Sequence, residues 1–285
     1  MVKVLNPNLE QGDVLSAEAL AAFARNTIFA GNIHHWPEVE STNSLALQAA
    51  AEAKNPTEGA VFMADAQTAG RGRGQHTWHS ERGNGLYASF LVRPKILPVH
   101  ILWLSLSAAL AVQDAVRGAT ELNADIRWPN DLLFGEKKFC GILTEASSDP
   151  AHVQYAVIGI GINVNHAEFP SELSGIATSL RMELGRNISR VQLAGLLVRA
   201  LDREYRTLLQ AAHTADHTGR QFGPIINKIS AGSSYVMGRK VHVEENGGYT
   251  GITDGLDFRG FLRVRTDEGL RTVISGSVRP LAKEI

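Results

Sequence analysis

The chain has 285 residues, which is long enough for a large core and for more than one domain. Its 28 basic and 29 acidic side chains nearly cancel, so the overall charge excludes bulk attraction to nucleic acid or to an anionic membrane. Cys140 is the only cysteine, which excludes an intrachain disulfide and suits a reducing cytosol.

The sequence of the N-terminal region predicts little regular secondary structure. Residues 1–35 contain one predicted helix, which starts at Ser16 and ends at 31–32. A winged helix-turn-helix needs about three helices, so we expect an N-terminal extension and no DNA partner. No basic segment precedes an apolar one here, and the longest apolar run, 101–112, is too short to span a bilayer. We therefore expect a soluble, cytoplasmic protein with no membrane partner.

A polar run follows a strand predicted at His35–Val39. Ser41, Thr42 and Asn43 precede an alanine-rich stretch that stops at residues 55–56. This is the pattern of a helix start with hydroxyl and amide caps. The alternative is that the free N–H groups at this helix start hold a polar group of a ligand. The sequence alone favours the plain cap.

A loop rich in glycine and arginine follows a strand predicted at Ala60–Ala64. Between Gly70 and Gly74, three glycines alternate with two arginines. Backbone amides and guanidinium groups in such a loop are suited to phosphate. The loop is neither a P-loop nor a GxGxxG motif, because the spacing and the terminal Lys-Ser/Thr are missing. A flexible basic loop explains these residues equally well.

The stretch 126–141 follows a strand predicted at Gly85–Val92 and a buried helix predicted at Ile101–Arg117. Its first strand ends at a proline, whose fixed φ excludes a central strand position, and the polar pair Asn130-Asp131 follows. A turn at 135–136 then predicts a hairpin that brings two lysines to the neighbouring strand. Alone, this stretch is explained more simply as an exposed turn with solvated charges.

The second half of the chain predicts a buried strand at Val153–Val164 and an amphipathic helix at 189–208. Gly159 and Gly161 in that strand allow another group to approach the backbone closely, although tight sheet packing is the alternative. From Gly232 onward, short apolar runs alternate with glycine-containing turns at a spacing typical of β-barrels. We therefore expect a second, all-β domain.

Several short motifs occur together and in one order along the chain. They are Ser41-Thr42-Asn43, Gln67, Gly70–Arg73 with Trp78, Trp128–Asp131, Lys138 with Gly141, and Gly159–Asn163. In this combination the chain resembles the biotin protein ligases over about residues 36–285. The resemblance implies an α+β fold: a catalytic domain at 36–231, with a mixed β-sheet backed by helices, and a small C-terminal SH3-like β-barrel at 232–285.

The resemblance also implies an activity. Biotin and ATP, with Mg²⁺, would form biotinyl-5′-AMP and pyrophosphate, and a lysine of a biotin carboxyl carrier domain would then accept the biotinyl group. The catalytic residues would be Lys138, Arg73 and Asp131. Biotin would be bound by Ser41, Thr42, Asn43, Gln67, Gly70, Arg71, Gly72, Arg73, Lys138 and Gly141. ATP or the adenylate would be bound by Arg71, Arg73, Trp78, Asn130, Lys138 and Asn163. Magnesium would be bound by Asn130 and Asp131.

These implied roles make physical sense. The charge of Lys138 would offset the repulsion between the biotin carboxylate and the α-phosphate, two anions that must meet. Arg71 and Arg73 would grip phosphate, and Trp78 offers a face to adenine or a lid for the loop. The oxygens of Asn130 and Asp131 are the hard ligands that Mg²⁺ prefers.

The chain departs from the family pattern in three places. Arg127 replaces the usual lysine before Trp128, with the charge kept, and the segment 74–77 lacks a further glycine-arginine pair. A winged helix is not predicted, so repressor function is not expected. The alternatives are a lipoate protein ligase, which lacks this loop and the Trp-Pro-Asn-Asp motif, or a non-catalytic regulator that binds biotinyl-AMP. An exposed sheet edge would also permit a homodimer.

Overall fold

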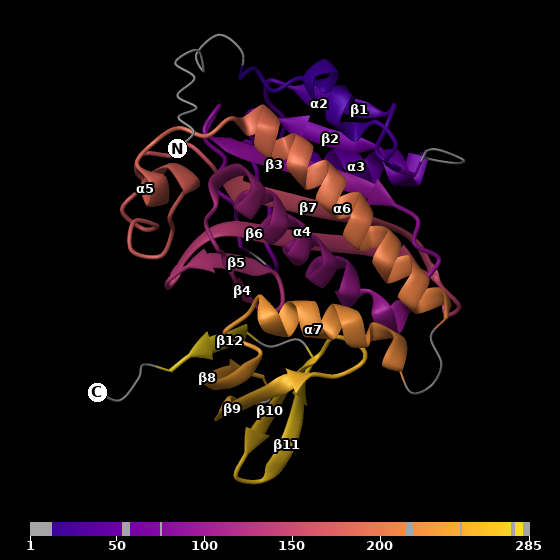
Figure 1. Cartoon of the computed structure of the whole chain (residues 1–285), viewed down its shortest axis with the longest axis vertical. Helices are drawn as coiled ribbons and strands as arrows, with labels where there is room; N and C mark the ends of the chain where they lie inside the picture. The colour runs from indigo at the N-terminus through magenta and orange to yellow at the C-terminus, as the bar shows by residue number, and fades with distance from the viewer. Residues whose placement is uncertain are drawn as a thin grey trace, which may run out of the picture.

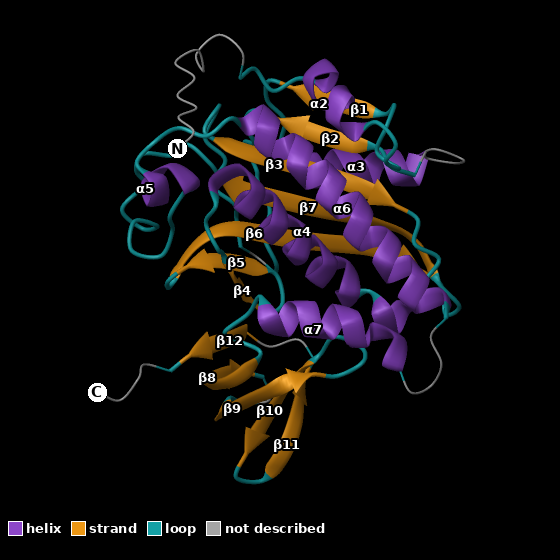
Figure 2. Ribbon diagram, in the orientation of Figure 1, coloured by secondary structure: helices purple, strands orange, loops and turns teal. Residues whose placement is uncertain are grey.

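The computed structural model describes residues 13–52, 58–74, 76–214, 219–245, 247–274 and 277–281. A seven-stranded sheet with helices on both faces forms the main body, and a second, five-stranded sheet follows near the C-terminus (Figure 1). Helices, strands and loops are distinguished by colour in Figure 2. This is the predicted α+β class, with two sheets in separate parts of the chain.

The large sheet has the strand order β1-β2-β3-β7-β6-β5-β4. Only β1 and β2 pair in parallel, and every other neighbouring pair is antiparallel, so the predicted mixed sheet is confirmed. The strands are β1 (Ile33–Trp36), β2 (Val61–Ala64), β3 (Gly85–Val92), β4 (Asp125–Arg127), β5 (Asp131–Phe134), β6 (Lys137–Ser148) and β7 (Val153–Asn163).

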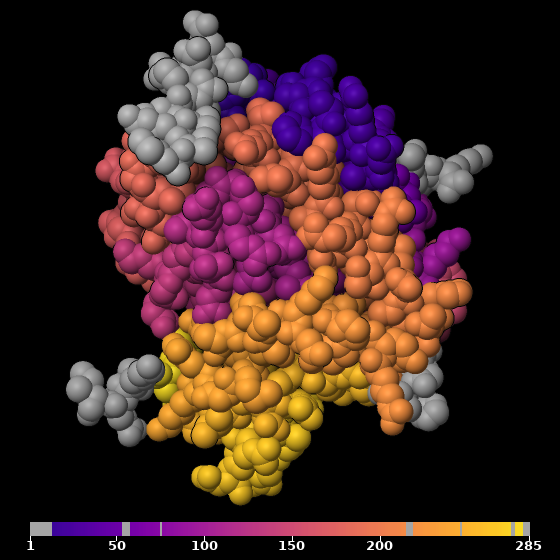
Figure 3. Space-filling view, viewed as in Figure 1, coloured from indigo at the N-terminus to yellow at the C-terminus, as the bar shows by residue number. Residues whose placement is uncertain are grey.

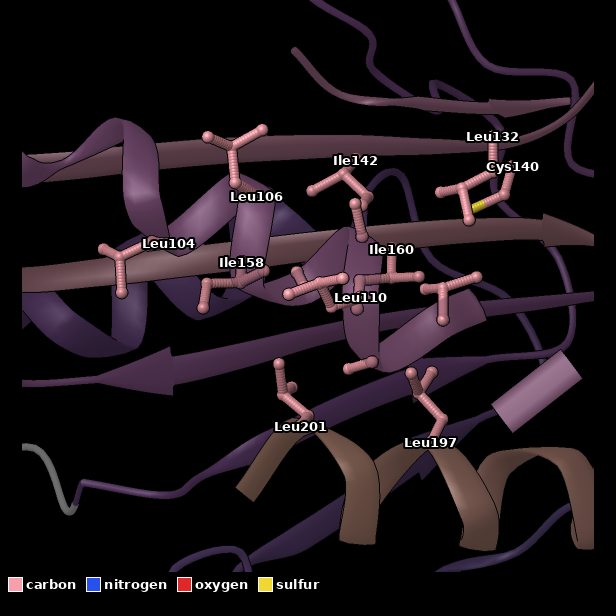
Figure 4. Close-up of a cluster of buried hydrophobic side chains, with 14 of the residues drawn as sticks. Leu104, Leu106, Leu110, Leu132, Cys140, Ile142, Ile158, Ile160, Leu197 and Leu201 are labelled. Carbon is pink, nitrogen blue, oxygen red and sulfur yellow. The ribbon is translucent and has the colours of Figure 1, made fainter. Parts of the chain in front are cut away.

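One face of this sheet is covered by α4 (Leu102–Thr120) and α6 (Arg190–His213) (Figure 1). Helix α6 starts where the sequence predicts, because the hydroxyl of Ser189 accepts a hydrogen bond from the backbone N–H of Gln192. The two helices and the sheet form one apolar core, and each large aliphatic side chain buried there contributes about 1.5–3 kcal/mol. Figure 4 shows part of this core, with Leu104, Leu106, Leu110, Leu132, Cys140, Ile142, Ile158, Ile160, Leu197 and Leu201 labelled.

The helical stretch Pro98–Thr120, which contains α4, is long and apolar enough to cross a membrane, but 72% of its most apolar window is buried inside the protein. It is therefore the core helix of this domain. Cys140 also lies in this core, where burial raises the pKa of its thiol far above the ordinary range. The thiol therefore packs in the core and is chemically inert.

The opposite face of the sheet is covered only in part. Helix α3 (Thr42–Glu52) packs Ala46 and Ala50 against Phe62, Leu91 and Val157. Side chains of a strand alternate between faces, so Gly159 and Gly161 lie on the same face as Val157. Beyond α3, this face is therefore floored by glycines rather than by apolar side chains.

The second sheet has the order β11-β10-β9-β8-β12, and all its pairs are antiparallel. Its strands are β8 (Met237–Glu244), β9 (Tyr249–Leu256), β10 (Leu262–Thr266), β11 (Gly269–Val273) and β12 (Ser277–Pro280). Within the described residues no pairing joins β11 to β12. The strands form an open sheet with those two at its edges, so the closed barrel expected from the sequence is not seen.

The second sheet is attached closely to the main body (Figure 3). The indole N–H of Trp128 donates to the carbonyl of Gly260 at 2.9 Å, and that of Trp103 donates to the carbonyl of Phe258 at 3.0 Å. Helix α7 (Gly223–Ala231) leads into this sheet. Both indoles are buried at this junction, so the two parts share a packed interface.

Some predicted elements have other boundaries. The first strand is β1, two residues before the predicted start, and α2 (Ala17–Ala24), capped by Ser16 as predicted, ends well before residue 31. Neither α5 (Leu180–Leu184) nor α7 was predicted, because both are short. Helix α2 packs against α6. The domain boundaries predicted at 35–36 and 231–232 stay a prediction.

Candidate active site

A floor of glycines lies at the centre of the candidate site. Gly141 of β6 pairs directly with Gly161 of β7, and Gly159 lies two residues before it. A Cβ atom at Gly161 would lie only 2.5 Å from Nε1 of Trp78, and one at Gly159 only 2.0 Å from Oδ1 of Asn43. Side chains from other parts of the chain therefore rest directly on the sheet backbone, which only glycine permits.

A β-bulge aims Lys138 at this floor. In β6, Lys138 and Gly141 are three residues apart, so an unbroken strand would point them to opposite faces. However, Leu132 of β5 pairs with Cys140, and the next residue, Leu133, pairs with Lys138, so β6 contains one extra residue between them, Phe139. The bulge reverses the alternation. As a result, a Cβ at Gly141 would lie 3.0 Å from Nζ of Lys138.

Asp131 is held between two cations. Its Oδ1 lies 2.6 Å from Nζ of Lys138, and its Oδ2 lies 2.7 Å from a guanidinium nitrogen of Arg127. Burial raises the pKa of the Asp131 carboxyl, but the charges of Lys138 and Arg127 outweigh burial and hold the pKa below its ordinary value. The carboxylate is therefore ionised at neutral pH, and it orients the ammonium group of Lys138, which also lies 5.2 Å from the centre of the Trp78 ring.

A buried polar network lines the other end of the floor. Oε1 of Gln67 accepts from the backbone N–H of Thr42 at 2.9 Å, and Nε2 of Gln67 donates to the hydroxyl of Ser80 at 2.9 Å. The hydroxyl of Ser89 lies 2.6 Å from Oδ1 of Asn43 and 2.8 Å from the hydroxyl of Thr42. These groups offer several donors and acceptors in a confined, partly apolar space, which suits a small polar ring of a ligand.

The glycine- and arginine-rich loop closes over the floor. Arg71 donates to Oε1 of Glu145 at 2.7 Å, and Arg73 donates to Oδ1 of Asn130 at 3.2 Å. The Trp78 ring packs against Gly141 and Gly161 of the glycine floor, while its indole N–H has no hydrogen-bond partner in the described residues. Gln75, part of the charge-poor segment of the loop, lies outside the described residues. In this arrangement both arginines are engaged by partners within the protein.

The hollow that remains has a volume of only about 50 Å³. Pockets for small molecules are typically about 300–1,000 Å³, so the Trp78 loop must move outward to admit a ligand. A second hollow of about 250 Å³ lies next to it, between the two sheets, and shares Arg73, Asn130 and Ile142 in its lining. The small hollow is lined by Ser41, Thr42, Asn43, Gln67, Arg71, Gly72, Arg73, Trp78, Tyr87, Asn130, Lys138, Gly141, Ile142, Leu143, Gly159, Ile160 and Gly161.

Most predicted site residues thus converge on one hollow. Three of them do not line it. The backbone carbonyl of Gly70 accepts a hydrogen bond from the N–H of Trp78 at 2.8 Å. Asp131 contributes by holding the ammonium group of Lys138. Asn163 is buried at the end of β7, where its amide donates to the carbonyl of Thr178 at 3.1 Å. It is engaged in holding that segment, and its contact with a nucleotide stays a prediction.

The sequence analysis did not name several residues that contribute to the site, among them Ser89 and Glu145. Ser89 and Glu145 each bind Asn43, the latter by accepting from its amide nitrogen at 3.0 Å. A hydroxyl within the otherwise apolar strand β3 was a signal for Ser89. Glu145 gave no comparable signal, because an acidic residue near a strand end is ordinary at a surface.

Asn130 and Asp131 do not fit a magnesium site in this arrangement. Both oxygens of Asp131 face cations, and Oδ1 of Asn130 accepts from Arg73. A magnesium ion would be repelled by the three cations already there. The amide nitrogen of Asn130 is also engaged, because it donates to the carbonyl of Ile142. Their role as magnesium ligands stays a prediction.

Two family models match different parts of this chain. The model of the Biotin/lipoate A/B protein ligase family matches residues 36–163, and that of the Biotin protein ligase C terminal domain matches residues 236–279. The chain thus matches a family of protein ligases that includes both biotin and lipoate ligases, and its C-terminal part matches a domain named for the biotin protein ligases.

Individual relatives narrow the family assignment to the biotin protein ligases. The Bifunctional ligase/repressor BirA of Bacillus subtilis is 37% identical over 229 residues, 79% of this chain and 67% of the relative. The Biotin–[acetyl-CoA-carboxylase] ligase of Mycobacterium tuberculosis is 34% identical over 241 residues, 82% of each chain. The solved structure of the biotin protein ligase from Aquifex aeolicus in complex with biotin and ATP superposes with a TM-score of 0.75 at 31% identity, covering 88% of this chain and 99% of the other. The chain belongs to the biotin protein ligase family, and it is a ligase.

Proposed function

We propose that this protein attaches biotin to a specific lysine of a biotin carboxyl carrier domain in two steps. In the first, an oxygen of the biotin carboxylate attacks the α-phosphorus of ATP, the bond between the α- and β-phosphates breaks, and pyrophosphate leaves. In the second, the amine of the acceptor lysine attacks the acyl carbon of biotinyl-5′-AMP, an amide forms and AMP leaves, with loss of one proton from the amine.

The observation that carries this proposal is the placement of Lys138. Its ammonium group lies above the glycine floor, held by Asp131 and next to Trp78. A carboxylate lying on that floor would meet a fixed positive charge where it approaches the α-phosphate. Such a preorganised charge lowers the repulsion between two reacting anions and is commonly among the largest contributions to catalysis.

The remaining residues of the site fit the two substrates. The amide and hydroxyl groups of Thr42, Gln67 and Ser89 match a ring that both donates and accepts hydrogen bonds, such as the ureido ring of biotin. Arg71 and Arg73 are placed to exchange Glu145 and Asn130 for phosphate oxygens when the loop closes on a ligand. Magnesium enters with ATP, as the counter-ion of its phosphates.

We place the reaction in the cytoplasm with a carboxylase as the partner. The buried free thiol of Cys140 needs no oxidising compartment, and the related enzyme of M. tuberculosis is named for acetyl-CoA carboxylase. The cavity of about 250 Å³ beside Arg73 and Asn130 offers a route by which an extended lysine side chain can reach the small hollow.

The test uses the purified full chain in two assays. ATP–pyrophosphate exchange measured with biotin, and separately with lipoate, reports the first step. We expect exchange with biotin only. Transfer to a purified carrier domain, with its acceptor lysine replaced by arginine as the control, reports the second. Exchange with lipoate in place of biotin would assign the chain to the lipoate branch, and adenylate formation without any transfer would reduce it to a biotinyl-AMP-binding protein.

A further inference from the structure

A cluster of two histidines and a glutamate lies at the foot of the Trp78 loop and has no part in the proposed reaction. His79 and Glu81 follow Trp78 directly, whereas His166 lies just beyond the end of β7, more than eighty residues away. One ligand atom from each of the three lies within 4.8 Å of the other two. Nε2 of His166 lies 4.0 Å from Oε2 of Glu81.

His166 has an unusual environment for a histidine. Its side chain is completely buried, yet Nδ1 has no hydrogen-bond partner in the described residues and Nε2 has only the Tyr87 hydroxyl, at the long distance of 3.5 Å. The ring of Phe169 stacks on it, with 5.1 Å between ring centres. A buried polar ring that is so poorly satisfied costs free energy unless something else binds it.

We propose that His79, Glu81 and His166 together bind one divalent transition-metal ion of the zinc type. Three atoms within 4.8 Å of one another lie within about 2.8 Å of a common centre, and zinc bonds to nitrogen and oxygen are about 2.0–2.2 Å long. Shifts of less than about 1 Å by each of the three ligand atoms complete the set. Glu81 is exposed and His79 partly exposed, so both side chains have room for such shifts and water can fill the fourth position.

The two imidazoles decide which metal fits. Magnesium and calcium prefer oxygen ligands, whereas a set of two imidazoles and one carboxylate suits zinc, cobalt, nickel or iron(II). The magnesium that accompanies ATP therefore does not compete for this site.

The ion would join two segments that lie far apart in the sequence. Residues 78–81 form the end of the loop that closes over the glycine floor, and the Tyr87 hydroxyl already donates to the carbonyl of Glu81 at 3.0 Å. Across the cluster, the hydroxyl of Ser179 donates to the carbonyl of His166 at 2.6 Å. A bound ion would thus hold His79 and Glu81 against the segment after β7 and leave the loop before them, including Trp78, free to open.

The experiment measures metal binding by the chelator-treated full chain, without substrates. We expect titration with Zn²⁺, followed by calorimetry, to show one saturable site that excess Mg²⁺ does not block, and Co²⁺ to give a visible absorption band at the same stoichiometry. The variants His79→Gln and Glu81→Gln change exposed or partly exposed side chains, so they should fold, and each should weaken Zn²⁺ binding at least about tenfold and reduce the cobalt band.

The matched control is His152→Gln. This histidine is on the surface beside Asp149, away from the cluster, and should bind Zn²⁺ as the wild type does. If the wild type has no one-equivalent site, or if the cluster variants bind Zn²⁺ as tightly as the control, the proposal is wrong. Because no substrate is present, this result does not depend on the proposed ligase activity.

Discussion

Two hollows of the molecule differ sharply in size and in chemistry. The larger, about 680 Å³, lies between α4, α6, α7 and β4, near Arg117, Lys228 and Ser234. The smaller, about 50 Å³, lies on the glycine floor beneath Trp78. Size alone would point to the first as the active site, yet the residues of the family motifs lie in the second.

The charges explain this difference. In the large hollow, Glu204 is paired with Lys228 at 2.9 Å and Arg203 at 3.1 Å, and Asp114 is paired with Arg117 and Arg203. Such pairs neutralise one another in place. In the small hollow, Lys138 and Arg71 are also paired, with Asp131 and Glu145, but Arg73 and Arg127 leave an excess of positive charge. These cations and a polar network converge on bare backbone, and the space is small because the Trp78 loop fills it. Convergent charge and a glycine floor, rather than volume, are the reasons for proposing that the small hollow is the site of the chemistry.

The largest effect should follow from Lys138→Ala. Removing the charge that faces the two reacting anions should lower biotin-dependent ATP–pyrophosphate exchange by about a hundred- to a thousandfold. The fold should persist, because Asp131 keeps its pair with Arg127. Lys137→Ala is the matched control, since that neighbour is exposed and should stay within about twofold of wild type. A folded Lys138→Ala protein with normal exchange would remove Lys138 from the mechanism.

The second largest effect should follow from Gly161→Ala. The new Cβ would lie 2.5 Å from Nε1 of Trp78 and would occupy the floor on which biotin is proposed to lie. Overpacking of this kind costs about 1–3 kcal/mol, so we expect KM for biotin to rise about 5- to 150-fold. Gly175→Ala is the control, because a Cβ there meets nothing within 4 Å. Unchanged KM in Gly161→Ala would show that biotin does not use this floor.

Arg73→Ala removes a contact between the loop and Asn130. Its effect, on escape of the adenylate, should be similar to or smaller than the effect of Gly161→Ala on KM. If the loop retains the reactive adenylate, losing a charge-assisted contact of about 1.5–3 kcal/mol should speed its escape about ten- to a hundredfold. Blotting for biotin on an unrelated protein measures that escape. Arg82→Ala removes an exposed arginine just beyond the loop and serves as the control. Equal background labelling by both variants would exclude Arg73 as a latch.

The smallest effect is expected in the large hollow. Arg117 is mostly exposed and pairs with Asp114 on the helix surface, an interaction worth about 0–1 kcal/mol. Arg117→Ala should therefore change biotin-dependent exchange by less than about twofold. A loss comparable with that of Lys138→Ala would make the large hollow part of the active site and would overturn the contrast between the two.

The sequence by itself determined the local features of this protein. The amphipathic pattern after Ser189 predicted α6, and the turn at 135–136 predicted the hairpin of β5 and β6, because periodicity and turn chemistry act over a few residues. The combination of short motifs indicated the family, and it named most of the residues that converge on the small hollow.

Only the tertiary structure decided which side chains share a face and which distant segments meet. The bulge at Phe139 brings Lys138 and Gly141 to one side of the sheet, and it arises from the register between strands, which the local sequence does not encode. The contacts of Ser89 and Glu145 with Asn43, and the approach of His166 to Glu81, join residues that are far apart in the chain. Such pairings depend on how the whole sheet assembles.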